Sequence, residues 1–452
     1  MTRLHFASAL LPSGWCDDVQ VIVGDGTITA ITAGATPQSG DERHQLAIPG
    51  LASLHSHAFQ RGMAGLAEMR GEVADTFWTW RETMYRFALT MTPDDVESVA
   101  TLLYAEMLER GFTRVGEFHY LHHDPGGAPY ANPAEMAARI AQATEATGIG
   151  LTLLPSFYAH GSFGGAAPRA GQRRFISSID QFAELMTASR KAVSSLRGAN
   201  VGIAPHSLRA VTPDELTAIV PLAEGGPVHI HAAEQTREVE DCVAWSGRRP
   251  VEWLLDHAPV DQRWCLIHAT HMTATETTAL AASGAVAGLC PLTEASLGDG
   301  IFPAREYCDA GGRFGIGTDS NILIGVADEL RQLEYGQRLK HRARNMLSRG
   351  PGVSTGRALF DAALAGGTQA LAQACGGIQQ GARADIVSLD TSHPSLAERR
   401  GDAILDGFIF AAGADAIDCV WAGGNKVVEG GRHRLRQKAR DRFNATIRSF
   451  VA

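Results

Sequence analysis

Four segments of the sequence end in residues that commonly bind divalent metal ions. The first carries His55 and His57, which are two residues apart, so both imidazoles point the same way in an extended chain. Later short apolar runs end in His231, His268 and Asp319. A single His-x-His pair is weak evidence for a metal site, whereas four such ends together are strong evidence. We therefore predict one metal ion with these ligands: His55, His57, His231 and Asp319.

The predicted ligands and their neighbours suit hydrolytic chemistry. Three imidazoles and one carboxylate favour Zn²⁺ or another borderline divalent ion, which lowers the pKa of a bound water. His268, with Asp319, would orient or deprotonate that water, and Glu234 would carry its proton to a leaving nitrogen. Each residue also has a structural alternative. His268 could be a hydrogen-bonded core histidine, and Glu234 could be a carboxylate on a helix face.

The elements that must position these residues alternate along the middle of the chain. Capped helices are predicted from Thr92-Pro93 to Gly111, from Asn132-Pro133 to Gly148 and from Thr212-Pro213 to Gly226. Short apolar strands separate them. This alternation predicts an α/β fold with a closed (β/α)₈ TIM-like barrel rather than an open doubly wound sheet. The eight strand candidates are 46–54, 113–118, 151–154, 201–204, 228–231, 264–267, 285–289 and 314–317. In such a barrel, the C-terminal strand ends carry the chemistry.

The two ends of the chain have a different sequence pattern from the middle. Segments 19–31, 384–389 and 419–428 are short β-like runs with turn glycines. We predict that residues 1–46 and 371–452 build one small β-sandwich module, which also carries a terminal helix. Residues 47–370 would then form the barrel.

Composition limits the classes of protein further. The 452 residues are 45% hydrophobic, which excludes a disordered chain, and 40 basic against 49 acidic residues give a net charge of −9. This charge argues against non-specific binding to nucleic acid or anionic membrane. No apolar run is long enough to span a membrane, and the N-terminus lacks the features of a signal peptide. Seven scattered cysteines without a C-x-x-C pair predict a reduced, cytoplasmic protein without disulfides.

The segments Pro49–His57 and Gly381–Val387 match the opening strand and the returning module of a known family. On these segments the chain resembles the amidohydrolase superfamily over nearly its full length. One subdivision of the family uses two metals bridged by a carboxylated lysine, but none of the four lysines here follows a barrel strand. The His-x-x-Glu of residues 231–234 instead resembles the mononuclear deaminase branch. The resemblance implies one divalent ion, Zn²⁺, and hydrolytic release of ammonia.

The loops predicted at the barrel mouth carry cations. Arg81 lies in the 58–85 segment and Arg209 follows Pro205-His206-Ser207-Leu208. Forked guanidinium groups pair with carboxylates, so two of them suit a dicarboxylate. Both segments resemble the branch members that hydrolyse N-formimino-L-glutamate to N-formyl-L-glutamate and ammonia in histidine degradation. That resemblance implies a homodimer, as is common among relatives, and these substrate contacts: Gln60, Arg81, Tyr120, His206 and Arg209.

Several readings remain open at this stage. Arg81 could be a surface charge, Gln60 and His206 could bind loop backbone, and Tyr120 could pack at the rim. A second metal site at His119, His122 and His123 is disfavoured, because that strand carries no ligand in this branch. The chain could act on a nucleobase or on another N-formimino amino acid. It could also be a non-catalytic scaffold, although such proteins usually lose their ligands.

Overall fold

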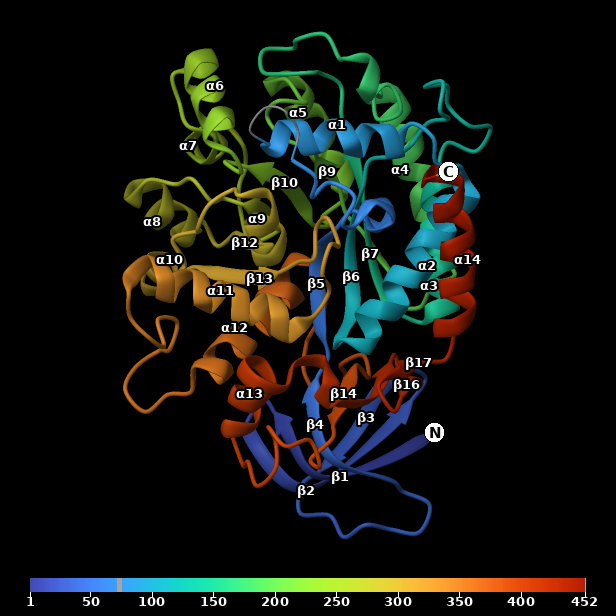
Figure 1. The fold of residues 1–452 in the computed structure, drawn as a ribbon, viewed down its shortest axis with the longest axis vertical. Helices are drawn as coiled ribbons and strands as arrows, with labels where there is room; N and C mark the ends of the chain where they lie inside the picture. Colours follow the sequence, from blue (N-terminus) through green and yellow to red (C-terminus); the bar gives the residue numbers. More distant parts are fainter. Residues whose placement is uncertain (71–74, 452) are drawn as a thin grey trace.

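Parallel strands in eight positions form the barrel in the computed structural model, which describes residues 1–70 and 75–451 (Figure 1). They pair in two sheets, β5-β6-β7-β8 with β9 beside β7, and β10-β11-β12-β13. Parallel bridges from Ser56 to Asp319 and from Ile203 to Val228 join these sheets into a closed barrel. The predicted (β/α)₈ fold is confirmed. The strands are β5 (Leu51–Ser56), β6 (Phe112–His119), β7 (Gly150–Phe157), β8 (Asn200–Val201), β9 (Ala204–Pro205), β10 (Val228–Ala232), β11 (Trp264–His268), β12 (Val286–Leu289) and β13 (Arg313–Ile316).

Helices follow the strands, and several start at a Ser or Thr whose side chain caps the helix. Thr92 accepts a hydrogen bond from the backbone of Asp95 and donates its own backbone N–H to the Asp95 carboxylate, which fixes the start of α2. The second predicted start, at Asn132-Pro133, is shifted, because α3 begins at Glu135. The barrel helices are α1 (Phe77–Ala88), α2 (Pro93–Glu109), α3 (Glu135–Thr147), α4 (Ile179–Val193), α5 (Pro213–Ile219), α6 (Thr236–Ser246), α7 (Pro250–His257), α8 (Ala274–Ser283), α9 (Pro291–Leu297), α10 (Ala304–Asp309), α11 (Val326–His341) and α12 (Thr355–Ala370).

The two ends of the chain meet in one β module below the barrel (Figure 1). Its eight strands form a continuous sheet in the order β17-β16-β15-β14-β4-β1-β2-β3, and its own core includes Leu4, Phe6 and Trp421. The predicted module from both termini is confirmed. After it, α14 (Arg436–Val451) returns along the barrel beside α2. The strands and the short helix are β1 (Thr2–Leu11), β2 (Gly14–Gly24), β3 (Thr27–Thr32), β4 (Glu42–Pro49), β14 (Ile386–Leu389), β15 (Ile417–Ala422), β16 (Asn425–Glu429), β17 (Arg432–His433) and α13 (Ala403–Gly407).

The first predicted barrel strand, 46–54, is wrong in its first half. Residues 46–49 belong to β4, which crosses the predicted boundary at residue 46 and pairs with β14 of the module. Gly50 donates its N–H to Asp385 O (3.0 Å), and Leu51 donates to Gly111 O (3.1 Å), so the chain changes partners there. A Cβ at Gly50 would lie 2.3 Å from the Thr113 side chain, which requires glycine at this close approach.

Among the described helices, none is both long and apolar enough to cross a membrane.

Candidate metal centre and substrate pocket

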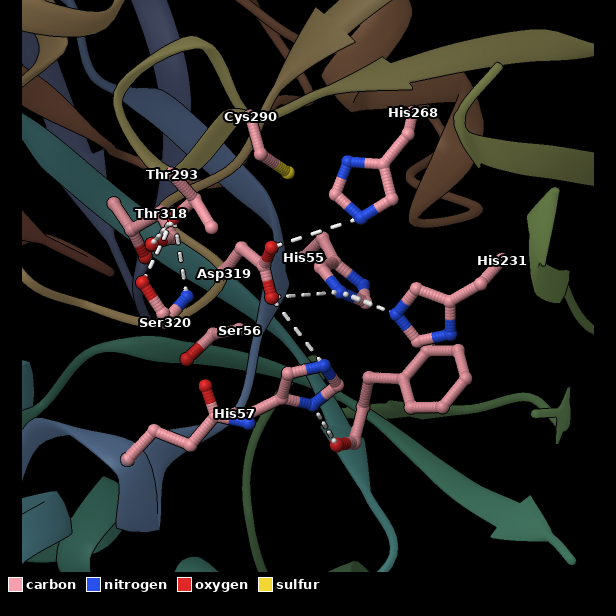
Figure 2. Close-up of polar contacts among 12 residues, drawn as sticks. His55, Ser56, His57, His231, His268, Cys290, Thr293, Thr318, Asp319 and Ser320 are labelled. Carbon is pink, nitrogen blue, oxygen red and sulfur yellow. Dashed lines mark hydrogen bonds and ion pairs between the residues drawn. The ribbon is translucent and has the colours of Figure 1, made fainter. Parts of the chain in front are cut away.

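Three barrel strand ends bring the four predicted metal ligands together (Figure 2). Asp319 Oδ1 lies 3.4 Å from His55 Nε2 and 3.3 Å from His57 Nε2. His55 Nε2 lies 3.1 Å from His231 Nε2. All four side chains are buried. The potential ligand atoms therefore converge on one point, as the spacing of these residues predicts.

The seam between the first and last barrel strands fixes two of these ligand segments against each other. The backbone N–H groups of Thr318 and Asp319 both donate to His55 O at 3.0 Å, and His57 N donates to Asp319 O at 3.0 Å. Asp319 adopts a φ of +44°, a left-handed conformation that aspartate tolerates better than most residues. Asn321 donates its side-chain amide to Asp319 O (2.9 Å) and His57 O (3.1 Å) and so holds this turn.

The protonation of the histidines leaves lone pairs directed at the centre. His57 donates Nδ1–H to Phe118 O and His231 donates Nδ1–H to His206 O, both at 2.9 Å, so each Nε2 is an acceptor. Burial and neighbouring histidines lower the pKa of His55 and His231, which keeps both rings neutral. Neutral imidazoles and a carboxylate, packed with nitrogen facing nitrogen, fit a single divalent cation.

His268 and Glu234 lie on the pocket side of this cluster. His268 Nε2 is 3.7 Å from both Glu234 Oε1 and Asp319 Oδ2, too far for direct hydrogen bonds and a suitable span for a bridging water. Burial lowers the pKa of His268, but Glu234, Glu294 and Asp319 outweigh it and raise the pKa overall. Burial raises the pKa of the Glu234 carboxyl. Both groups are thus placed to exchange protons with a small molecule between them.

Two acidic residues that the sequence reading missed hold this pair in place. Glu294, in α9, accepts Nδ1–H of His268 at 3.2 Å and the N–H of Cys290 at 2.9 Å. Glu238, in α6, accepts the backbone N–H groups of Ala233 and Glu234, each at 3.1 Å. Glu238 lies four residues after Glu234 and could have been found from that spacing. No spacing rule points to Glu294, which follows a different strand.

All five predicted substrate residues line the same pocket as His268, Glu234 and Asp319. Gln60 donates its amide to Tyr120 Oη at 2.7 Å, and its own Oε1 is buried without a partner. The pocket wall also includes residues that the sequence reading did not single out as contacts: Phe77, Trp80, Met84, Tyr85, Tyr158, Phe175 and Leu297. Several of these come from α1, which crosses the end of the barrel opposite the module (Figure 1). Residues 71–74 of the predicted 58–85 mouth segment lie outside the described residues.

Of the two predicted arginines, Arg209 is buried and Arg81 is half-buried, and neither has a hydrogen bond in the described chain. Within the described chain, Arg81 has no hydrogen bond or ion pair and lies over the ring of Trp78, 4.5 Å from its centroid. Arg209 is 8% exposed, and its carboxylate neighbour is Glu234, with Nη2 3.9 Å from Oε2. The Nε atoms of both arginines are buried without a hydrogen-bond partner among residues 1–70 and 75–451. Burying such donors is costly, so their arrangement favours an anionic ligand.

The disfavoured second histidine group has a structural role in the described residues. His122 donates to Ser156 O at 2.8 Å, and His123 donates to Ile176 O at 2.7 Å. Burial lowers the pKa of His119 to about 4. These neutral rings support the loop after β6.

Comparison with known proteins agrees with this geometry. The sequence family described as "Amidohydrolase family" matches residues 46–427. The chain therefore belongs to the amidohydrolase family, as its motifs predict. A second family, "Formimidoylglutamate deiminase HutF, N-terminal domain", matches residues 1–45. The formimidoylglutamate deiminase of Pseudomonas aeruginosa is 49% identical over 445 residues, which cover 98% of each chain. Within the amidohydrolases, the chain thus belongs with the formimidoylglutamate deiminases, and this finer resemblance is also confirmed.

Solved structures support the fold over the full length. The crystal structure of an amidohydrolase from Brucella melitensis is 58% identical, covers 100% of both chains and has a TM-score of 0.97. An adenosine deaminase from Xanthomonas campestris with bound zinc has a TM-score of 0.81 at 22% identity, covering 99% of this chain and 98% of that chain. The second likeness shows the shared fold alone.

Proposed function

We propose that this chain hydrolyses N-formimino-L-glutamate to N-formyl-L-glutamate and ammonia. The observation that carries the proposal is the pair of arginines without hydrogen bonds in the described chain, the half-buried Arg81 and the buried Arg209, in the pocket that leads to the metal ligands. A dicarboxylate supplies the acceptors that these guanidinium groups lack. The similarity to the formimidoylglutamate deiminase of Pseudomonas aeruginosa supports the same substrate.

The metal in this proposal is Zn²⁺, held by His55, His57, His231 and Asp319. The donor set suits zinc, and the structural relative from Xanthomonas campestris contains it. When bound, the ion lowers the pKa of the attacking water and polarises it.

The residues of the chain then position the substrate and move its protons. Arg81 and Arg209 bind the two carboxylates, while Gln60, Tyr120 and His206 orient the formimino group toward the ligands. Water adds to the formimino carbon, and Glu234 carries one of its protons to the imine nitrogen. Glu234 then carries the second proton, from the new hydroxyl group, to the same nitrogen, so the carbonyl of the product forms as the carbon–nitrogen bond breaks and ammonia leaves. His268 and Asp319 hold the attacking oxygen. His268 Nε2 lies 3.7 Å from both Asp319 Oδ2 and Glu234 Oε1, so one water can contact all three groups.

A screen for released ammonia tests this function directly. Protein loaded with zinc is incubated with N-formimino-L-glutamate, N-formimino-L-aspartate, guanine and cytosine. We expect the highest kcat/KM for N-formimino-L-glutamate. Preference for guanine or cytosine would replace the proposal with a nucleobase deaminase, and preference for the aspartate analogue would assign a shorter dicarboxylate.

Metal analysis of the purified protein separates an enzyme from a non-catalytic scaffold. We expect one divalent ion per chain, lost in the His231→Ala variant. Absence of bound metal together with no ammonia release would favour the scaffold. The predicted homodimer and a role in cytoplasmic histidine degradation are part of the same proposal, and the dimer is checked by the mass in solution.

A further inference from the structure

Three guanidinium groups from different parts of the mouth surround one indole ring. Trp78 of α1 has the Cζ of Arg81 4.5 Å from its ring centroid, that of Arg237 at 5.2 Å and that of Arg209 at 5.8 Å. Arg81 lies one helical turn further along α1, Arg209 follows β9, and Arg237 is in α6. Among these, Arg81 and Arg209 line the pocket, whereas Trp78 lies outside its lining.

We propose that Trp78 is a positioning residue that sets the spacing of Arg81 and Arg209 and thereby the selectivity for a dicarboxylate. The inference rests on the proposed function in assigning these arginines to the substrate. Trp78 would act only through them, because its ring does not border the pocket.

The stacking geometry explains why an aromatic ring suits this task. A guanidinium placed over a ring uses its flat face for the contact and keeps its N–H groups, which lie in its plane, free for a carboxylate. A carboxylate side chain at position 78 would hold the arginines more strongly but would compete for those same donors. The indole thus holds the guanidinium groups of Arg81 and Arg209 without accepting hydrogen bonds from them.

Exposure separates the outer arginine from the inner two. Arg237 has a side chain that is 65% exposed, and its Nε lies 3.8 Å from Asp241. Arg209 is buried beside Glu234, with Nη2 3.9 Å from Oε2, and Arg81 is half-buried without a hydrogen bond or ion pair in the described chain. Two like charges on one ring repel each other, so their separation depends on the ring between them and on the anion that neutralises them. A ligand with two carboxylates gains from this arrangement more than a ligand with one.

Binding of matched ligands tests the proposal without turnover. N-formyl-L-glutamate and N-formyl-L-glutamine have nearly the same shape but carry two and one carboxylates. Their Kd values are measured by calorimetry on zinc-loaded wild type, Trp78→Leu, Trp78→Phe and Arg237→Gln. Because two cation–π contacts are lost, Trp78→Leu should weaken N-formyl-L-glutamate binding by about tenfold.

The selectivity ratio gives the decisive comparison. N-formyl-L-glutamine should lose no more than about threefold in Trp78→Leu, since it engages one arginine fewer, and Trp78→Phe should restore much of the loss. Arg237→Gln, on the exposed side of the same ring, should change either Kd by less than about twofold. Equal losses for both ligands, or no loss for either, would overturn the proposal.

These outcomes are distinguishable from failure of the proposed reaction. Wild type that binds N-formyl-L-glutamate in preference to N-formyl-L-glutamine, but releases no ammonia from N-formimino-L-glutamate, would overturn the reaction and leave the positioning role of Trp78 standing. A kcat/KM that falls for N-formimino-L-glutamate in Trp78→Leu with unchanged ligand selectivity would assign Trp78 a merely structural role.

Discussion

Two kinds of buried arginine lie within the same barrel. Arg174 is fully buried and donates to His123 O at 2.7 Å, to Met91 O at 2.8 Å, to Ala88 O and to the Tyr130 hydroxyl. Arg209 is almost as buried and has no hydrogen bond in the described chain. The first arginine stabilises the end of α1, whereas the second leaves its donors for something else. Burial alone therefore does not distinguish a structural cation from a binding one, but the pairing of its donors does.

Among the variants, replacement of Glu234, the proposed proton carrier, should have the largest effect on turnover. Glu234→Gln should lower kcat by about 10³-fold, because an amide cannot carry the proton from water to nitrogen. Metal content and the Kd for N-formyl-L-glutamate should stay within about threefold of wild type, since the amide keeps the shape of the carboxylate. The exposed carboxylate of the helix that follows Glu234, in Glu240→Gln of α6, is the control and should leave kcat unchanged. Substantial turnover by Glu234→Gln would remove Glu234 from the proton path.

Replacing Arg209, which has no hydrogen bond in the described chain, should affect function and spare stability. Arg209→Met should raise KM and lower kcat/KM for N-formimino-L-glutamate by roughly 10²- to 10³-fold, since two charged hydrogen bonds to a carboxylate are lost. The Tm should be unchanged or higher, because a desolvated cation is removed. Steady-state kinetics and thermal unfolding check both parts. An unchanged KM would mean that Arg209 points away from the substrate.

Replacing Arg174, which is hydrogen-bonded, should lower stability and largely spare activity. Arg174→Met leaves several buried carbonyl oxygens without donors, so the free energy of unfolding should fall by about 3 kcal/mol. For the folded fraction, kcat/KM should fall far less than in Arg209→Met. Denaturant unfolding and kinetics on the same preparation give the two quantities. If Arg174→Met lost activity but not stability, the contrast between the two arginines would be broken.

Glu294 lies between these two kinds of residue, because it has partners and yet serves the site. Glu294→Gln should lower kcat by about tenfold through a less firmly oriented His268, with little change in KM. A KM increase with constant kcat would instead place Glu294 in substrate binding.

The sequence predicts the metal ligands of the site better than the residues that hold the site in place. His55, His57, His231 and Asp319 follow recognisable strands, and the barrel rule places such strand ends together. Glu294 contacts His268 from an element that is distant in sequence, so no local spacing reveals it. The contacts of Trp78 with Arg209 and Arg237 are equally distant, although Arg81 lies only one helical turn away. Tyr158 and Phe175 of the pocket wall could not be predicted from the sequence either, because only the packed barrel shows which aromatic rings face inward.

The fold was misread where tertiary pairing overrides a local pattern. Residues 46–54 form one apolar run, which by itself reads as a single strand. The division at Gly50 depends on β14 on one side and β6 on the other, and neither neighbour is visible in the run itself. The capped start of α2 was predictable because the Thr92–Asp95 capping box is local.

The position of β4 has a consequence for the order in which the protein can be made. On the ribosome, β1 to β4 emerge first, but the neighbour of β4 on one side, β14, lies near the other end of the chain. All the metal ligands and the whole barrel are therefore synthesised while one edge of β4 still lacks its partner. Such an open edge is a site for wrong pairing with other chains. That edge of β4 stays open until β14, Ile386–Leu389, has been synthesised and pairs with it.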